Sequence, residues 1–405
     1  MNTIEKVSPF QPESPVRPEN FEGRKEIIDK NLPFIYQASQ GYPTHFFIKG
    51  KRGMGKTSLA DYFKYIGEIN CKMLAIHVLN DGIHDVDSMV QQIVERLLNE
   101  IKRETWADNI MNTFKKHIKS IEFFSGKIEF RPDKETINFL KDNFPFFIEE
   151  IINKIKGNKN GLFIIIDDIN GLSRTSDFSN WYKSFADTIS TGTRDLPLIM
   201  VLTTYPENAG KFYAQNPSFN RLFKHIDIKG LKDSEIEDFF TKIFKQVGVT
   251  IEKKAMEYMV RFTSGLPNMM QEIGDGIFWF NTDNKIDEKD ALKGIIRAGH
   301  EIGLKYLQPA LDNSIRSESY LSIFRTLGND FNKHDLGEEY TFRKKDIVDK
   351  LDSRESKAFS DFLKRARELK IIEYAEGYKQ GVYTFTNNLY PIYFLIQYLE
   401  YENKL

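Results

Sequence analysis

The feature that most constrains this chain is a glycine-rich segment, GKRGMGKT, at residues 50–57. It has the spacing G-x-x-x-x-G-K-[ST], with Gly50, Gly55, Lys56 and Thr57 at the fixed places. The glycines let backbone N–H groups curve around a phosphate at the N-terminus of the following helix. The lysine bridges the β- and γ-phosphates, and the threonine hydroxyl binds Mg²⁺. The apolar run THFFIKG before the segment and a helix expected from about Lys56 supply the required strand–loop–helix context.

A second motif, LFIIIDD at residues 162–168, places two acids after a continuous apolar strand. A nucleotide site needs a carboxylate at the end of a neighbouring strand to hold Mg²⁺, and Asp167 suits that role together with Thr57. Asp168 stands where a general base for water would lie, so Asp168 and Lys56 are the expected catalytic residues of this site. The loop residues expected to contact ATP are Gly50, Lys51, Arg52, Gly53, Met54, Gly55, Lys56, Thr57 and Ser58.

The order of apolar segments predicts an α/β fold. Strand-like runs alternate with helical patterns over the first 230 residues, which is typical of a mostly parallel sheet. We expect an extended leader at 1–20, with four prolines, and an α/β core at 21–229. Within the core, residues 135–156 have the pattern of one helix, and residues 102–134 form an insertion. The chain then changes to helices, which we interpret as a lid at 230–312. Three helices and a hairpin predict a winged helix at 313–405.

Composition sets broad limits on function. The chain has 405 residues, a formal net charge of −1 and a single cysteine, Cys71. These values give no overall basic excess for nucleic acid and exclude a disulfide framework or a cysteine-based zinc site. The N-terminal residues lack the apolar segment of a signal peptide, and the longest purely aliphatic and Phe run, residues 162–166, is too short to cross a bilayer. We therefore expect a cytoplasmic protein without a membrane segment.

With these motifs in place, the chain resembles the P-loop ATPases of the AAA+ and STAND kind, in the branch related to origin-recognition and archaeal-type ATPases. The segment RPENFEGRKEI resembles the family's entry motif, in which Phe21, Gly23 and Arg24 would pack on the adenine. LTTYPEN resembles the end of the sensor-1 strand, where Thr204 or Thr203 would sense the γ-phosphate.

Two further segments carry the resemblance. TSGLPNMMQEIG resembles the Gly-x-Pro motif of the STAND lid, with Gly265 and Pro267, and this implies that Pro267 contributes to the nucleotide site. Arg221, in SFNRLF, lies where AAA+ rings carry an arginine that acts on the neighbouring subunit. An ordinary ion-pairing arginine before a strand is the alternative for this position. The resemblance implies ATP and Mg²⁺ as cofactors, and a homo-oligomer or a partner protein.

Two departures from the family pattern favour slow turnover. Asp168 stands where AAA+ machines usually have Glu, and its carboxylate reaches about 1.5 Å less far towards water. Pro267 and Asn268 replace a sensor-2 arginine that would stabilise charge in the transition state. We therefore expect ATP to act as a switch rather than as a fuel.

Two alternatives remain open at this stage. The segment 343–370 has ten basic and six acidic residues, and a DNA-binding ATPase of the initiator or transposition-regulator type would use such a helix in the major groove. The surplus is equally compatible with the solvated face of a protein-binding winged helix. The other alternative is a structural subunit locked by nucleotide, for example in an antiviral defence complex.

Overall fold

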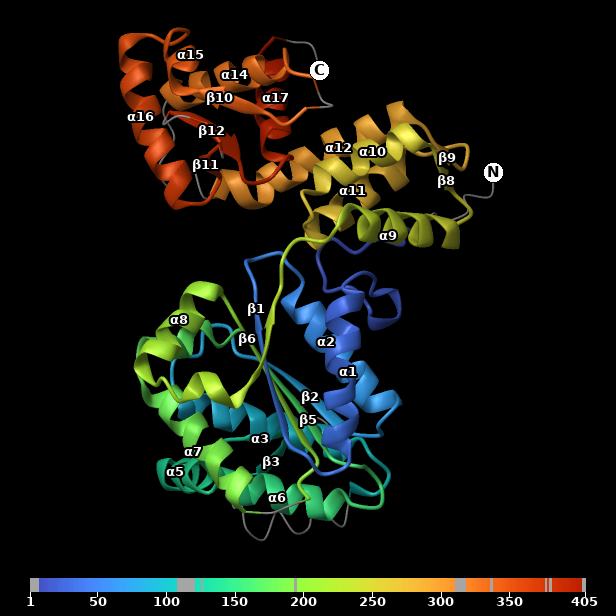
Figure 1. Ribbon diagram of the computed structural model, residues 1–405, viewed down its shortest axis with the longest axis vertical. Coiled ribbons are helices and arrows are strands. Elements are labelled where there is room, and N and C mark those ends of the chain that lie inside the picture. Colours follow the sequence, from blue (N-terminus) through green and yellow to red (C-terminus); the bar gives the residue numbers. More distant parts are fainter. Residues whose placement is uncertain are drawn as a thin grey trace. The chain divides into compact units, whose positions relative to one another are not determined.

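The computed structural model describes residues 7–107, 121–124, 127–192, 195–309, 318–335, 338–375, 377–378 and 381–402. The chain forms two compact units (Figure 1). Val16–Lys229 make up the first, which we call the core unit. Met1–Pro15 and Gly230–Leu405 make up the second unit.

The core unit is built on a five-stranded sheet in the order β2-β5-β6-β1-β7. All four neighbouring pairs are parallel. The strands are β1 (Thr44–Lys49), β2 (Leu74–Leu79), β5 (Leu162–Asp167), β6 (Leu198–Thr204) and β7 (Lys224–Asp227). The central strands β1, β5 and β6 are mainly apolar and buried on both faces, as is typical of parallel sheets, with a few buried polar residues such as His45, Asp167 and Thr203. The predicted α/β fold with a parallel sheet is confirmed.

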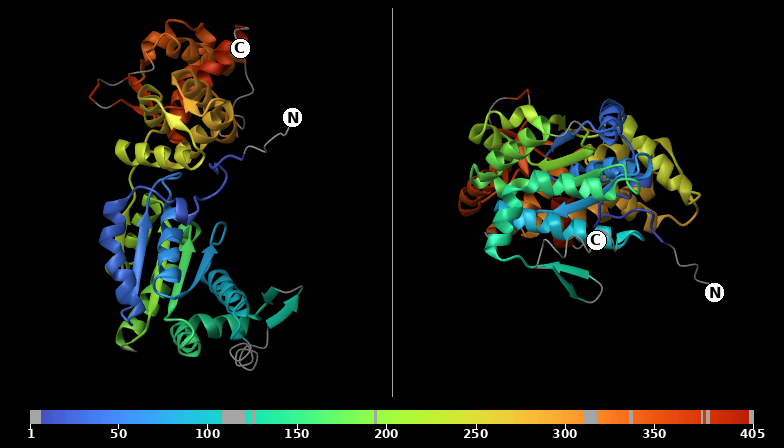
Figure 2. Two further views of the ribbon diagram at one scale, coloured as in Figure 1. Left: turned by 90° about the vertical axis from the view of Figure 1, so that its right-hand side faces the viewer. Right: turned by 90° about the horizontal axis from the view of Figure 1, so that it is seen from below.

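Helices cover both faces of this sheet (Figure 1 and Figure 2). Phe46 and Ile48 point to the face packed by α1 (Lys25–Ser39) and α2 (Lys56–Ile69). Phe47 points to the opposite face, because successive side chains on a strand alternate. That second face packs against α3 (Val86–Lys102), α5 (Lys134–Asp142), α6 (Phe144–Ile155), α7 (Asp177–Thr191) and α8 (Pro206–Gln215). The carboxyl ends of the parallel strands lie at the same edge of the sheet, where sheets of this kind bind ligands.

Two local features of the core unit differ from expectation. The single helix predicted over 135–156 is interrupted at Asn143, whose φ of −107° and ψ of 19° are not helical. Pro145 explains the break, since a proline inside a continuous helix loses a hydrogen bond and clashes with the preceding turn. The expected insertion at 102–134 contains an antiparallel hairpin, β3 (Ile121–Phe124) with β4 (Lys127–Phe130), while residues 108–120 lie outside the described range.

The second unit is mainly helical and shares one apolar core. Its first part has α9 (Asp233–Gln246), α10 (Lys253–Thr263), α11 (Pro267–Phe280) and α12 (Glu288–Ile302), with a short parallel pair, β8 (Thr250–Ile251) and β9 (Lys285–Ile286). A π-helical turn, Gly303–Leu307, follows α12. The rest has α14 (Glu318–Phe331), α15 (Lys344–Val348), α16 (Ser353–Glu368) and α17 (Tyr390–Tyr401). An antiparallel sheet of β10 (Thr341–Arg343), β12 (Val382–Phe385) and β11 (Ile372–Tyr374), in that order, accompanies them.

Ser353 has the side chain of an N-cap residue, but it is the first residue of α16 rather than its cap. The cap is Asp352, whose carboxylate accepts hydrogen bonds from the backbone of Arg354 and Glu355. Glu355 reaches back to the Asp352 N–H and completes a capping box. The third strand, β10, was not anticipated, because three residues give too short an alternating pattern.

The N-terminal segment is anchored in the second unit. Phe10 is 4 % exposed and its ring lies 4.9 Å from that of Phe244, with Phe239 beside it. The ring also fills the space over Gly274, where a Cβ would come within 2.2 Å of it. The Gln11 N–H donates to the side chain of Gln271. What we expected to be an extended leader therefore contributes a core side chain, and ends at a 3₁₀ turn, Pro18–Asn20.

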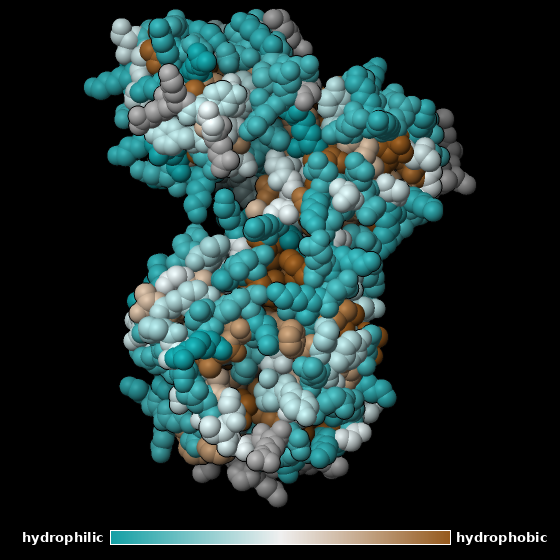
Figure 3. All heavy atoms as spheres, viewed as in Figure 1, coloured by the Kyte–Doolittle hydropathy of each residue, from teal (hydrophilic) through white to brown (hydrophobic). Residues whose placement is uncertain are grey.

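The exposed surface is mostly hydrophilic on the face displayed in Figure 3, with apolar residues scattered among polar ones. Across the ranges the structure describes, no helix combines the length and apolar character needed to cross a bilayer.

One buried polar pair in the core unit makes stability depend on pH. His45 on β1 is buried, and its Nδ1 lies 2.7 Å from the Tyr182 hydroxyl. Burial lowers the pKa of His45 from 6.5 to about 4, because the cationic form loses its hydration. In the unfolded chain the imidazole of His45 is protonated below about pH 6.5, whereas in the folded chain it stays neutral down to about pH 4. The stability that this group contributes is thus complete above pH 6.5 and is lost as the pH falls towards 4.

We predict that the core unit loses about 2 kcal/mol of unfolding free energy between pH 7 and pH 5 through His45 alone. The matched variant is His45→Gln, whose amide can bond to Tyr182 and does not titrate. Urea unfolding at both pH values should show the larger acid loss in the parent protein. Equal losses in parent and variant would show that His45 does not carry the effect.

Candidate nucleotide-binding site

The glycine-rich segment forms a loop between β1 and α2. Gly53 and Gly55 have φ of 79° and 78°, a left-handed conformation that glycine adopts without strain. A Cβ at Gly50 would lie 3.2 Å from the Ile228 side chain, so glycine also permits close packing there. Helix α2 starts at Lys56, directly after Gly55. The free N–H groups of its first turn and the loop backbone make an anion-binding concavity.

The Lys56 side chain returns over this loop. Its Nζ donates to the backbone carbonyl of Lys51 at 3.2 Å and lies 4.4 Å from the centre of the Tyr205 ring. Burial lowers the pKa of Lys56, and the nearby carboxylates of Asp167 and Asp168 oppose that effect. Neither of its two contacts is an ion pair. The ammonium can therefore exchange them for phosphate oxygens.

Asp167 ends β5 and is held from three elements. Its Oδ2 accepts from the Thr57 hydroxyl at 2.7 Å and lies 3.3 Å from His77 Nε2. Its Oδ1 accepts from the Thr203 hydroxyl. Burial alone would raise the pKa of Asp167, but the hydrogen bonds from His77, Thr203 and Thr57 outweigh it and lower the pKa. An ionised carboxylate beside a hydroxyl provides the hard oxygen ligands that Mg²⁺ prefers, so the residues present fit the ion.

Asp168 has an unusual backbone. Its φ of 60° and ψ of 64° place a non-glycine residue in the left-handed region, where strain often marks a functional site. Its N–H donates to the Thr203 hydroxyl at 2.9 Å. Its carboxylate accepts from the backbone and side-chain N–H groups of Asn170 and caps a 3₁₀ turn, Ile169–Arg174. The carboxylate of the expected base is thus already engaged by its neighbour.

Asn170 links this turn to the end of β6. Its Oδ1 accepts from the Thr204 hydroxyl, from the Tyr205 N–H and from the Asn208 amide, each at 2.9 Å. The two threonines proposed for sensing therefore differ: Thr203 binds Asp167, whereas Thr204 binds Asn170. The sequence analysis missed Asn170, for which the only signal is an amide side chain two residues after the acid pair.

The entry segment packs against the phosphate loop. Gly23 and Arg24 both have positive φ, 79° and 58°. The buried guanidinium of Arg24 donates to the carbonyl of Met54 in the loop at 2.7 Å and to that of Lys229 at 2.9 Å. Phe21 stacks on Tyr62 of α2 with ring centres 4.9 Å apart. The structure thus brings Arg24 to the phosphate loop and Phe21 to the helix that follows it.

The remaining predicted site residues are placed as follows. Lys51 and Arg52 are exposed on the loop, and Ser58 follows Thr57 in the first turn of α2. Arg221 is exposed in a 3₁₀ turn, Phe219–Leu222, and donates to the Ser218 hydroxyl at 3.1 Å. Pro267 is the first residue of α11 and belongs to the second unit.

Two side chains at this sheet edge were not anticipated. His77 on β2 has Nδ1 2.8 Å from Asp61 and Nε2 3.3 Å from Asp167. Burial alone would lower the pKa of His77, but the hydrogen bonds with both carboxylates raise it to about 9. Asn80, just after β2, is fully buried, and its side-chain amide has no hydrogen-bond partner among the described residues. No motif marks either residue, since their roles depend on which strands are neighbours.

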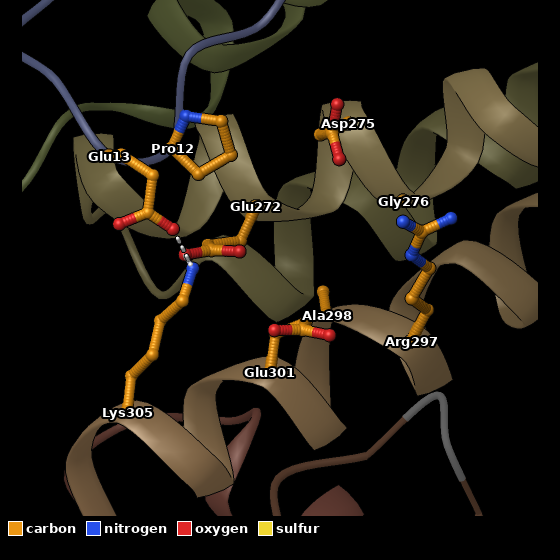
Figure 4. A pocket seen from close by; sticks show the side chains of 9 residues that line it. All are labelled: Pro12, Glu13, Glu272, Asp275, Gly276, Arg297, Ala298, Glu301 and Lys305. Atoms are coloured by element: carbon orange, nitrogen blue, oxygen red, sulfur yellow. Dashed lines mark hydrogen bonds and ion pairs between the residues drawn. The ribbon is translucent and has the colours of Figure 1, made fainter.

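A cavity of about 250 Å³ lies in the second unit and contains none of these residues (Figure 4). The Lys305 ammonium lies between Glu13 and the buried Glu272, and Asp275, Arg297 and Glu301 also line the cavity. This contact ties the N-terminal segment to the helices of the second unit, as Phe10 does. The cavity therefore lies where the N-terminal segment is held against the helices of the second unit.

Comparison with known proteins agrees with this geometry. Residues 24–175 match the model of the KAP family P-loop domain. No curated protein sequence matches the chain. Among solved structures, a Walker-type ATPase of Pyrococcus abyssi is similar at 16 % identity and a TM-score of 0.53, over 95 % of this chain and 99 % of that one. The ORC2 protein of Aeropyrum pernix is similar at 10 % identity and a TM-score of 0.55, over 94 % and 96 %.

The core unit is a P-loop NTPase domain. The parallel sheet, the glycine loop leading into α2 and the family match all establish this class. Its likeness to an origin-recognition protein, expected from the sequence, is confirmed for the fold. A fold of this class implies nucleotide binding.

We predict that Arg24→Met weakens nucleotide binding about tenfold, the loss expected from removing a charge-assisted hydrogen bond that fixes the loop backbone. Methionine keeps most of the apolar stem. Lys25→Met, an exposed neighbour at the start of α1, is the matched control. Titration with a fluorescent ADP analogue measures both. Equal affinities in the two variants would show that the Arg24 contacts do not support the loop.

Proposed function

We propose that this protein is an ATP-binding, slowly hydrolysing ATPase that acts as a nucleotide-dependent switch or assembly subunit. The observation that carries the proposal is the hydrogen bond between the Thr57 hydroxyl and the buried carboxylate of Asp167, with Lys56 above the same loop. The similar Aeropyrum pernix structure was solved with ADPNP and ADP, which supports an adenine nucleotide as the ligand.

The residues have separate parts in this proposal. The loop N–H groups and Lys56 bind the phosphates, while Thr57 and Asp167 hold Mg²⁺. The ion, when bound, neutralises phosphate charge and fixes the phosphate oxygens. Phe21, Gly23 and Arg24 are the residues against which the base would pack. Asp168 accepts the proton of the attacking water.

Slow turnover is supported by the position of Asp168. The Asp side chain is one methylene shorter than the usual Glu, and its carboxylate already accepts a hydrogen bond from Asn170. To serve as a base it must share or release that cap, and the geometry of proton transfer tolerates little displacement. Asn268, in place of a sensor-2 arginine, offers no cation to the phosphates.

The proposed switch uses the second unit. We assign residues 230–312 to a lid and 313–405 to a winged helix, within which residues 310–317, 336–337, 376, 379–380 and 403–405 lie outside the described range. The assignment is supported by the order helix, strand, two helices and hairpin from α14 to β12. Pro267 starts α11 and pre-sets its first turn, so it is our candidate for the lid contact with nucleotide. Arg221 is exposed, as an arginine acting on a neighbouring subunit must be.

We predict that Lys56→Ala abolishes measurable ATP binding, because the loop loses its phosphate-binding ammonium. Lys64→Ala is the matched control, since Lys64 lies on the same helix and pairs with Glu68. Calorimetric titration of both folded variants with ATP and Mg²⁺ measures the effect. Unchanged affinity in Lys56→Ala would contradict the site assignment.

We also predict that the parent protein differs in shape or oligomeric state between ADP and a non-hydrolysable ATP analogue. A ligand shifts such an equilibrium only by its differential affinity for the two states, so the γ-phosphate must be sensed. Small-angle scattering with light scattering measures both properties, and Lys56→Ala serves as the control that should not respond. Identical profiles in the two nucleotides would favour a locked structural subunit instead.

A DNA-binding ATPase is the second candidate function, because α16 presents its basic residues to solvent. Phe359, Phe362 and Leu363 are buried, while Arg354, Lys357 and Lys364 are exposed. Arg367 is less available, since its guanidinium lies 4.1 Å from the Tyr374 ring centre and donates to the Tyr374 hydroxyl. Duplex binding that weakens steeply with salt and is lost on neutralising α16 would favour this function.

A further inference from the structure

The strand β2 carries one polar side chain in an otherwise apolar sequence, LAIHVL. This residue, His77, faces the α1 and α2 side of the sheet, the same side as Asp167, because both positions alternate in phase with Ile165. A polar group in a buried strand is unfavourable unless it is hydrogen-bonded. Both ring nitrogens of His77 face a carboxylate oxygen, from Asp61 at 2.8 Å and Asp167 at 3.3 Å.

Asp61 and Thr57 make this arrangement a closed ring of contacts. They are four residues apart on α2 and therefore lie on the same helical face. Thr57 bonds to Oδ2 of Asp167, and His77 bonds to the same oxygen and to Asp61. Three elements, α2, β2 and β5, thus meet at one carboxylate oxygen.

This ring of contacts becomes important when Mg²⁺ binds, because Thr57 also has a role in holding the ion. In the proposed function its hydroxyl binds Mg²⁺, so its bond to Asp167 is given up or shared when the ion enters. Thr203 then holds Oδ1, and His77 is the contact that stays on Oδ2. A ligand carboxylate held by such partners loses less conformational freedom on metal binding.

We propose that Asp61 and His77 are positioning residues that orient the Asp167 carboxylate for the Mg²⁺–nucleotide complex, an inference that rests on the proposed function. Asp61 fixes the imidazole ring, and the ring fixes the carboxylate. The consequence is specific: the pair strengthens nucleotide binding only when Mg²⁺ is present. A merely structural pair would affect binding with and without the ion alike.

The test compares nucleotide affinity in Mg²⁺ and in EDTA, using a fluorescent ADP analogue and the full chain. His77→Leu removes both hydrogen bonds and should reduce the Mg²⁺-dependent gain in affinity about tenfold or more, as loss of such supporting contacts does at other metal sites. Its affinity in EDTA should stay within about twofold of the parent. His77→Gln should retain most of the gain, because its amide nitrogen can still donate to Oδ2.

The control is His225→Leu, which removes a histidine from β7, the opposite edge strand of the same sheet. It should leave both affinities unchanged. Thermal unfolding in EDTA verifies that each variant is folded. If His77→Leu does not fold, Asp61→Asn decides, since it keeps the histidine but weakens its anchor and should lower the Mg²⁺-dependent gain in the same direction.

Equal losses in Mg²⁺ and EDTA would overturn the inference, because the pair would then be structural. An unchanged Mg²⁺-dependent gain in His77→Leu, or in Asp61→Asn where that variant decides, would overturn it as well. Both results leave the proposed function standing, since the parent protein still binds nucleotide. If the parent protein binds the ADP analogue neither in Mg²⁺ nor in EDTA, the proposed function and this inference are both overturned.

Discussion

The buried carboxylate of Asp167 is the interaction on which the organisation of the core unit depends. An ionised group in the interior is costly unless its oxygens are hydrogen-bonded. Here the bonds come from α2, β2 and β6, through Thr57, His77 and Thr203. The bonds to this one carboxylate therefore link α2, β2 and β6 to the end of β5, and the Thr203 hydroxyl also accepts the N–H of Asp168.

The parts of this site that could be predicted from the sequence are those formed by residues close together in the chain. The loop spacing, the apolar strand before Asp167 and the alternation of strands and helices depend on neighbours in the chain, so they could be predicted. The ring through Asp61 and His77 could not, because it requires β2 to lie beside β5, an order that no local pattern encodes. Asn170 and the buried Asn80 escaped for the same reason.

The fold shows the same division between local and non-local information. The helical pattern over 135–156 outweighed a single proline in the prediction, whereas in the structure one helix ends at Asp142 and the next begins at Phe144, with Pro145 in its first turn. Phe10 sits in a proline-rich segment without periodicity, and its partners Phe239 and Phe244 are more than two hundred residues away. Its burial is decided by the space over Gly274, which only the assembled second unit provides.

Arg24 gives the proposed switch a physical starting point. The chain passes between the two units after Pro15 and after Lys229. Arg24 lies shortly after the first passage and binds the carbonyl of Lys229 at the second, and its other hydrogen bond goes to Met54 in the phosphate loop. Its two donors therefore join the phosphate loop to the last residue of the core unit. Phe10 and the Glu13–Lys305 contact anchor the segment before the first passage in the second unit. Through Arg24, the phosphate loop is thus joined to both chain segments that lead into the second unit, and these are the connections available to the proposed switch.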